Sequence, residues 1–181
     1  ETNIEALNNN FCQFENKFSK IGWVSTWSSK CGIASYSRRF INCMSDDIFV
    51  FCPYNEVNHS NEENINLIND DQVIPCWDYQ NSDGKNLDNL YSQVKAKNIT
   101  SLVIQFNFGF FDVNELNLLF EKLLASNVNL IIILHSTIPP KNDNYNYLFL
   151  LKNSLIKCSR LLVHTINDLN RLKKYGLVDN V

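Results

Sequence analysis

The chain has 181 residues, of which 45% are hydrophobic and 19% charged, so it can build one domain with a two-sided core but hardly two. Sixteen Lys and Arg against nineteen Asp and Glu give a net charge of −3, which argues against a nucleic-acid partner. No stretch approaches the roughly 20 apolar residues of a membrane-spanning helix, and no signal-peptide pattern opens the chain.

Residues 1–20 are polar with scattered Phe and are expected to form a linker or a short upstream helix. Strand-like and helix-like patterns alternate after them. The expected strands are 21–26, 48–52, 73–77, 102–106, 130–135 and 161–164. The expected helices cover 33–44, 87–94, 112–124, 148–156 and 165–175, with Asp112 and Thr165 as N-caps and Gly176 after the last one.

This alternation predicts an α/β fold with a parallel sheet and helices on both faces. Right-handed crossovers favour a Rossmann-like, doubly wound sheet of about six or seven strands in the order 3-2-1-4-5-6. Pro75 supports the order independently, because its missing backbone donor places the third strand at a sheet edge.

The six cysteines contain no C-x-x-C pair, and their density is low for a disulfide-stapled domain. We therefore expect reduced thiols, several of them in the core, and a cytoplasmic compartment. The acidic pairs at 46–47, 62–63 and 70–71 lie away from the predicted strand ends. We interpret them as solvated loop charge and expect no metal site.

In a doubly wound sheet, ligands bind beyond the carboxyl ends of the strands, near the switch point between the first and fourth strands. The loops after the first, fourth and fifth strands therefore hold the candidate site. The candidate substrate-binding residues in these loops are Lys30, Cys31, Gly32, Asn107, Phe108, Gly109, Ser136 and Thr137.

Gly32 lies where the first of these loops becomes a helix, so its bare backbone can face a phosphate or a sugar hydroxyl. Alternatively, Gly32 only permits close packing of the helix on the sheet. The sequence leaves both readings open. The G-x-G-x-x-G and G-x-x-x-x-G-K-[ST] fingerprints are absent, which argues against NAD-dependent and P-loop chemistry.

His135 follows the most apolar strand and is the candidate catalytic residue, since an imidazole can donate a hydrogen bond to a phosphate or sugar oxygen. The alternative is a core histidine bonded to a backbone carbonyl, and that alternative is favoured for His164. In the loop after the fourth strand, Asn107 and Gly109 are expected to face a ligand more than the phenylalanines do. If a further domain docks across the strand ends, we expect an open crevice with exposed apolar residues such as Phe108, Phe111 or Ile138 at its rim.

The segment IGWVSTWSSKCGIASYSRRF, at 21–40, resembles the opening of bacterial family 4 glycosyltransferases, the retaining GT-B enzymes of surface-polysaccharide assembly. The segments VIQFNFGFF, LIIILHST and LLVHTINDLNRLKKYGL match in order and spacing. Together the similarity covers residues 21–181.

The resemblance implies that 21–181 is the amino-terminal, acceptor-side half of a GT-B fold. The full protein would transfer a sugar from a nucleotide-sugar to a glycan or lipid-linked acceptor, with no cofactor beyond the donor substrate. The loop at Cys31 and Gly32 would approach the sugar diphosphate or acceptor, and His135 matches the family's histidine after the fifth strand. The resemblance also allows peripheral membrane association at the inner face of the membrane.

Two departures from the family pattern stand out. Many relatives have Gly-Gly where this chain has Cys31-Gly32, and the family's carboxyl-terminal Glu-x₇-Glu motif has no counterpart here. We therefore expect the donor-binding domain to lie in a longer parent protein and the isolated chain to be inactive. The alternatives are half of a GT-B-type nucleotide-sugar epimerase and a non-catalytic glycan-binding or scaffold domain.

Overall fold

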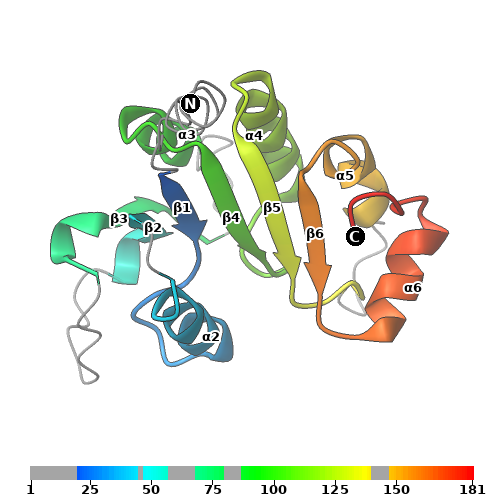
Figure 1. The fold of residues 1–181 in the computed structure, drawn as a ribbon, viewed down its shortest axis with the longest axis horizontal. Helices are drawn as coiled ribbons and strands as arrows, with labels where there is room; N and C mark the ends of the chain where they lie inside the picture. The colour runs from blue at the N-terminus through cyan, green and yellow to red at the C-terminus, as the bar shows by residue number, and fades with distance from the viewer. Residues whose placement is uncertain (1–19, 45–46, 57–67, 80–86, 140–146) are drawn as a thin grey trace, which may run out of the picture.

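The computed structural model describes residues 20–44, 47–56, 68–79, 87–139 and 147–181 (Figure 1). Within these ranges, six strands form one sheet in the order β3-β2-β1-β4-β5-β6, and every neighbouring pair is parallel. The predicted α/β, doubly wound fold and its strand order are therefore confirmed. The strands are β1 (Ile21–Val24), β2 (Ile48–Pro53), β3 (Val73–Trp77), β4 (Ser101–Phe106), β5 (Asn129–Leu134) and β6 (Arg160–Val163).

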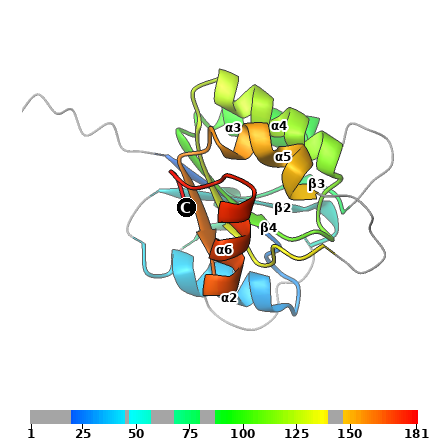
Figure 2. The same cartoon turned by 90° about the vertical axis from the view of Figure 1, so that its right-hand side faces the viewer.

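Helices cover both faces of the sheet (Figure 2). Helix α2 packs on one face, where Ile41 joins a core with Trp23, Val103 and Ile133. The opposite face is buried by α3, α4 and α5, whose apolar stripes share a larger core. The helices are α2 (Gly32–Ile41), α3 (Asp88–Ala96), α4 (Val113–Ala125), α5 (Tyr147–Leu155) and α6 (Ile166–Lys174), and two short 3₁₀ turns are Tyr54–Glu56 and Asp70–Gln72.

Local sequence signals place several of these boundaries. Asp112 accepts hydrogen bonds from the backbone N–H groups of Asn114 and Glu115, and Thr165 accepts one from Asp168, so both predicted N-caps are present. Gly176 follows α6 with φ 79°, the left-handed conformation expected of a glycine at that position. Pro75 lies in β3, which is an edge strand of the sheet, as predicted.

The cysteines of the described residues are free thiols, as predicted. Cys52, Cys76 and Cys158 are buried. Burial raises the pKa of Cys52 and that of Cys158 to about 12, so both stay protonated at neutral pH. No helix in the described part of the chain is long and apolar enough to cross a membrane. The predicted linker or upstream helix at 1–20 lies, apart from Lys20, outside the described residues.

A glycine in β1 is essential to the packing of the sheet, although its sequence context does not reveal this. A Cβ atom at Gly22 would lie 2.5 Å from Leu102 Cδ1 and 2.8 Å from Phe51 Cε2, both inside a close-packed core. Gly32 differs, because no atom lies within 4 Å of the corresponding position. The close-packing explanation for Gly32 is therefore wrong for the residues that the structure describes.

We expect Gly22→Ala to lower the free energy of unfolding by about 1–3 kcal/mol, because the added methyl overpacks the core. Gly32→Ala is the matched control: it adds a methyl in open space at a helix start and should leave stability unchanged or slightly raised. Urea denaturation of both variants measures the difference. Equal stability of the two variants would contradict this account of Gly22.

Candidate functional site

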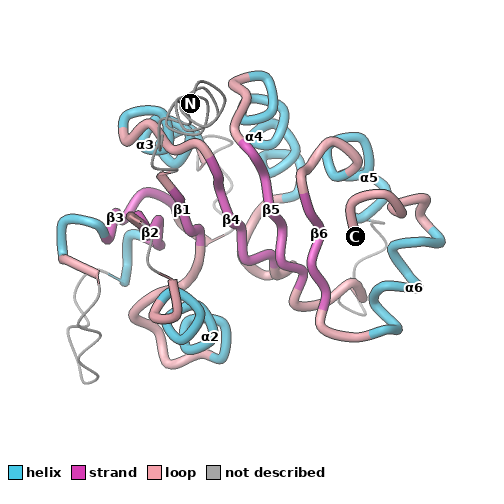
Figure 3. Tube along the Cα trace, in the orientation of Figure 1, coloured by secondary structure: helices cyan, strands magenta, loops and turns pink. Residues whose placement is uncertain are grey.

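The loops that follow β1, β4, β5 and β6 lie at one edge of the sheet, because parallel strands end on the same side (Figure 3). We call this the carboxyl edge. The structure places most of the predicted site residues in three parts of it. These parts are the β1–α2 loop, a histidine cluster on the α2 face of the sheet, and a pocket between α5 and α6.

The β1–α2 loop is held by the carboxylate of Glu56, which lies just after β2 and is 5% exposed. Glu56 Oε2 accepts hydrogen bonds from the backbone N–H groups of Trp27 at 2.5 Å and Ser28 at 3.1 Å. Its Oε1 accepts one from the Tyr79 hydroxyl at 2.8 Å. Arg38 of α2 also donates to the Trp27 carbonyl. The loop is thus tied to β2, β3 and its own helix.

Sequence reasoning missed Glu56. The only signal was a single carboxylate directly after a buried strand, and its partners lie 23 to 29 residues away. A buried carboxylate requires hydrogen-bond donors, and three donors meet it here. Burial and the bond to Glu56 raise the pKa of Tyr79, so its hydroxyl remains a donor at neutral pH.

Cys31 is the N-cap of α2, with its Sγ 3.4 Å from the backbone nitrogen of Ala34. The side chains of Ser29 and Thr26 lie 3.3 Å and 3.1 Å from the same sulfur. Burial opposes ionisation of this thiol, but these hydrogen bonds outweigh it and lower the pKa of Cys31. Lys30 and Gly32 are exposed on either side of Cys31, so all three predicted residues of this loop come together.

His135 follows β5 at the carboxyl edge, as predicted, and its ring lies on the α2 face. Its Nε2 lies 2.5 Å from Oε1 of Gln105, a fully buried residue of β4. The Tyr36 ring meets it edge-on at 5.6 Å between centroids, and the His164 ring lies at 4.9 Å. The structure therefore joins His135 to His164 and to α2, while the partner of its Nε2 is a side-chain amide rather than the backbone carbonyl considered above.

The half-buried environment makes His135 a neutral imidazole near pH 7. Burial and, to a smaller extent, the charge of His164 lower its pKa to about 4. A neutral ring has one N–H donor and one acceptor nitrogen. With Nε2 as the donor to Gln105, the other nitrogen is the acceptor. His135 can therefore orient a polar group, but it carries no positive charge under neutral conditions.

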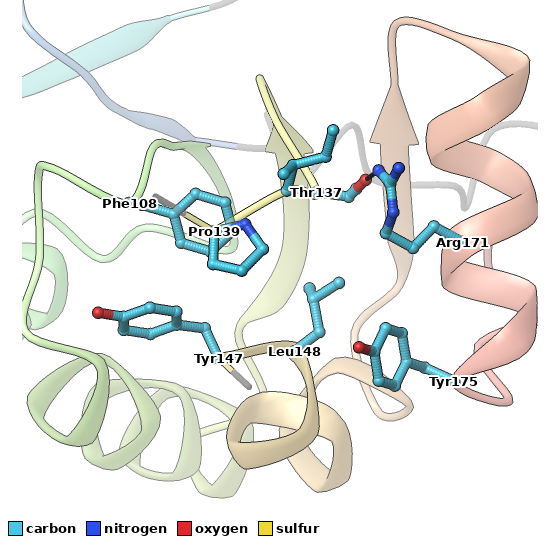
Figure 4. Close-up of a pocket in the computed structure, with 8 residues that line it drawn as sticks. Phe108, Thr137, Pro139, Tyr147, Leu148, Arg171 and Tyr175 are labelled. Atoms are coloured by element: carbon cyan, nitrogen blue, oxygen red, sulfur yellow. Dashed lines mark hydrogen bonds between the residues drawn. The ribbon is translucent and has the colours of Figure 1, made fainter. Parts of the chain in front are cut away.

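A pocket of 220 Å³ lies at the carboxyl edge between the β5–α5 loop, α5 and α6 (Figure 4). It brings together two predicted residues, Phe108 and Thr137, which come from different loops. His135 and the β1–α2 loop are not among the residues that line it. The lining residues are Phe108, Thr137, Ile138, Pro139, Tyr147, Leu148, Arg171 and Tyr175.

One corner of the pocket is a polar network around Asp168. Thr137, which is fully buried, donates to Asp168 Oδ1 and accepts from Arg171 Nη1. Arg171 also forms an ion pair with Asp168 at 3.2 Å, and Thr165 donates to Asp168 Oδ2 at 2.6 Å. Hydrogen bonds from Thr137 and Thr165 lower the pKa of Asp168 and keep it ionised. Arg171 is a site residue that the sequence did not reveal.

Asn107 and Ser136 have local structural roles at this edge. Asn107 Oδ1 accepts from the backbone N–H of Gly109 at 3.0 Å, and Gly109 itself is exposed. The Ser136 hydroxyl donates to the Ile138 carbonyl and accepts from its N–H. Both side chains thus form tight turns of their own loops.

The expected apolar rim is only partly present. Ile138 is 59% exposed, as predicted, but Phe108 and Phe111 are 8% and 4% exposed, so the prediction for these two is wrong. Phe108 packs against Tyr147 at 5.2 Å between ring centroids, and Phe111 packs against Trp77 at 4.8 Å. Both rings are covered by aromatic side chains from distant parts of the sequence.

Within the described ranges, no three His, Cys, Asp or Glu side chains lie close enough together to hold a metal ion. No protein-family model matches the chain, and no curated protein sequence matches it significantly. These comparisons do not show a family.

We expect Glu56→Gln to destabilise the fold by about 1.5–3 kcal/mol, because an amide replaces a carboxylate that accepts three hydrogen bonds. The amide exchange of Trp27 and Ser28 should accelerate in the same variant. Glu121→Gln is the matched control: its carboxylate is exposed on α4, and the change should stay within about 0.5 kcal/mol. If the two variants lose equal stability, the role given to Glu56 is wrong.

His135 should titrate by NMR with a pKa near 4, below the 6.5 of an ordinary histidine. Because the folded-state pKa is the lower one, the neutral ring stabilises the fold above pH 6.5, and this contribution is lost as the pH falls towards 4. Wild type should therefore lose more stability between pH 7 and pH 4 than His135→Gln. A titration midpoint near 6.5 would refute this.

Proposed function

We propose that residues 21–181 form the acceptor-side domain of a retaining GT-B glycosyltransferase. In this proposal the full-length enzyme transfers a sugar from a nucleotide-sugar to a glycan or lipid-linked acceptor, and a second domain holds the donor. The sequence resemblance over 21–181 suggests the family. The doubly wound sheet agrees with it, since ligands of such sheets bind at the carboxyl edge.

The observation that carries the proposal is the open backbone at Gly32. The start of α2 is exposed, and among the described residues no distant part of the chain fills the space where a side chain of residue 32 would extend. Glu56 fixes the loop that leads into this helix. A rigid, exposed helix start, where the helix dipole favours negative charge, suits a diphosphate or a sugar oxygen. Because packing does not require a glycine there, contact with a ligand is the better explanation for it.

His135 remains the proposed catalytic histidine. Tyr36, which touches its ring, lies five residues after Cys31 on the same helix, so His135 is on the same side of the sheet as the β1–α2 loop. The bond to Gln105 fixes the ring, and the remaining nitrogen is the one that would meet a substrate hydroxyl. We propose that this neutral ring orients a substrate oxygen in the way a preorganised polar group does.

A non-catalytic glycan-binding domain is the second candidate, and the aromatic pocket at α5 and α6 favours it over a nucleotide-sugar epimerase. Such a domain would bind sugars through the pocket lined by Phe108 and Tyr147 and would have no use for an open Gly32. The two candidates therefore differ in what the β1–α2 loop contributes.

The test is Gly32→Ala in the full-length enzyme, assayed as release of nucleoside diphosphate from a panel of nucleotide-sugars. The methyl adds no clash within the protein, so the melting temperature should not fall. Turnover should drop by at least about tenfold, because the methyl displaces a bound oxygen from the loop. Lys95→Ala, at an exposed position of α3, is the control, and its turnover should equal that of wild type. A Gly32→Ala enzyme with wild-type turnover would contradict the proposal.

A further inference from the structure

The size of the pocket between α5 and α6 limits what it can hold. Its 220 Å³ lies below the roughly 300–1,000 Å³ that is typical of pockets for drug-sized ligands. An extended oligosaccharide or a dinucleotide cannot enter it as a whole. One six-membered ring with its substituents is the size of ligand that fits.

The walls of the pocket are flat and apolar. The ring of Phe108 packs on that of Tyr147, and Leu148, only 3% exposed, lies between Tyr147 and Tyr175 (Figure 4). Pro139 also lines the pocket. Aromatic rings of this kind pack against the C–H faces of a pyranose, which are apolar although its edge carries hydroxyl groups. The walls thus suit a ring with two apolar faces.

The polar corner has donors available but no net charge. Arg171 uses Nη1 for Thr137 and Asp168, and among the described residues its Nη2 and Nε make no hydrogen bond. Its guanidinium is already paired with the Asp168 carboxylate, and its side chain is 32% exposed. A phosphate would have to compete with that carboxylate for the cation. Hydroxyl oxygens need only the remaining N–H groups, so the corner favours a neutral polar ligand over an anion.

We propose that this pocket binds one neutral hexopyranose unit, with an apolar face against Tyr147 and its hydroxyl groups at Arg171. The assignment of this sugar unit to the acceptor rests on the proposed transferase function. Sugar binding by the pocket does not depend on that function. The acceptor class is then a neutral glycan rather than a bare phosphorylated lipid.

Saturation-transfer NMR on this chain with the methyl glycosides of glucose, galactose and N-acetylglucosamine tests the proposal. At least one glycoside should receive saturation, and its affinity should fall at least tenfold in Tyr147→Ala. Tyr147→Phe is the matched control and should bind like wild type, because the hydroxyl lies on the side of the ring away from Arg171 (Figure 4). Arg171→Lys should also weaken binding, because it removes the fork of donors.

Binding of none of the glycosides, or unchanged binding in a folded Tyr147→Ala protein, would overturn the proposal. Displacement of the glycoside by equimolar inorganic phosphate would overturn it too, because the corner would then be an anion site. Circular dichroism confirms that each variant is folded. If a glycoside binds but Gly32→Ala keeps wild-type turnover, the transferase proposal is rejected and sugar binding by the pocket stands. If no glycoside binds but Gly32→Ala loses turnover, sugar binding by the pocket is rejected and the transferase proposal stands.

Discussion

The buried carboxylate of Glu56 determines the path of the chain at the centre of the carboxyl edge. Both of its oxygens are used, one by two backbone N–H groups of the β1–α2 loop and the other by Tyr79 after β3. Without it, the loop that begins α2 would have two unpaired donors in a partly buried position, which is costly. The exposed start of α2, where Gly32 lies, therefore depends on a contact made from β2.

A second carboxylate, which is partly exposed, has the same role at the other end of this edge. Asp168, at the start of α6, binds Thr137 of the β5–α5 loop and orients Arg171. The pocket walls thus come from loops and helices whose relative positions are fixed by one polar network and by aromatic packing. Between the two carboxylates lies His135, held by Gln105. The carboxyl edge is preorganised along its length, as a binding site requires.

The fold was predictable because its signals are local. Apolar runs, helix caps and Pro75 each act within a few residues, and the rules for crossovers then favour the strand order that the structure has. The hydrogen bonds that hold the site together were not predictable, because Glu56 and Gln105 bond to partners 23 to 30 residues away. Phe108 and Phe111 were misjudged for the same reason. Their position at a strand end suggested a rim, and only the fold shows the rings that cover them.

Gly22 and Gly32 also show which features the sequence alone cannot predict. Sequence context drew attention to Gly32, at a loop-to-helix boundary, and left two explanations for it. Gly22, inside a strand, has no sequence feature that marks it as important, yet it is the glycine that the core requires. Whether a missing side chain serves packing or a ligand depends on what occupies the space around it. That information exists only once the strands and helices are assembled.

The central claim is that ligands bind at the carboxyl edge, and amide NMR of the ¹⁵N-labelled chain titrated with the methyl glycosides tests it most directly. The account predicts chemical-shift changes at Phe108, Thr137, Ile138 and Arg171, with the opposite edge of the sheet unaffected. Changes confined to that opposite edge, at Thr100, Val128 and Ser159, would contradict it.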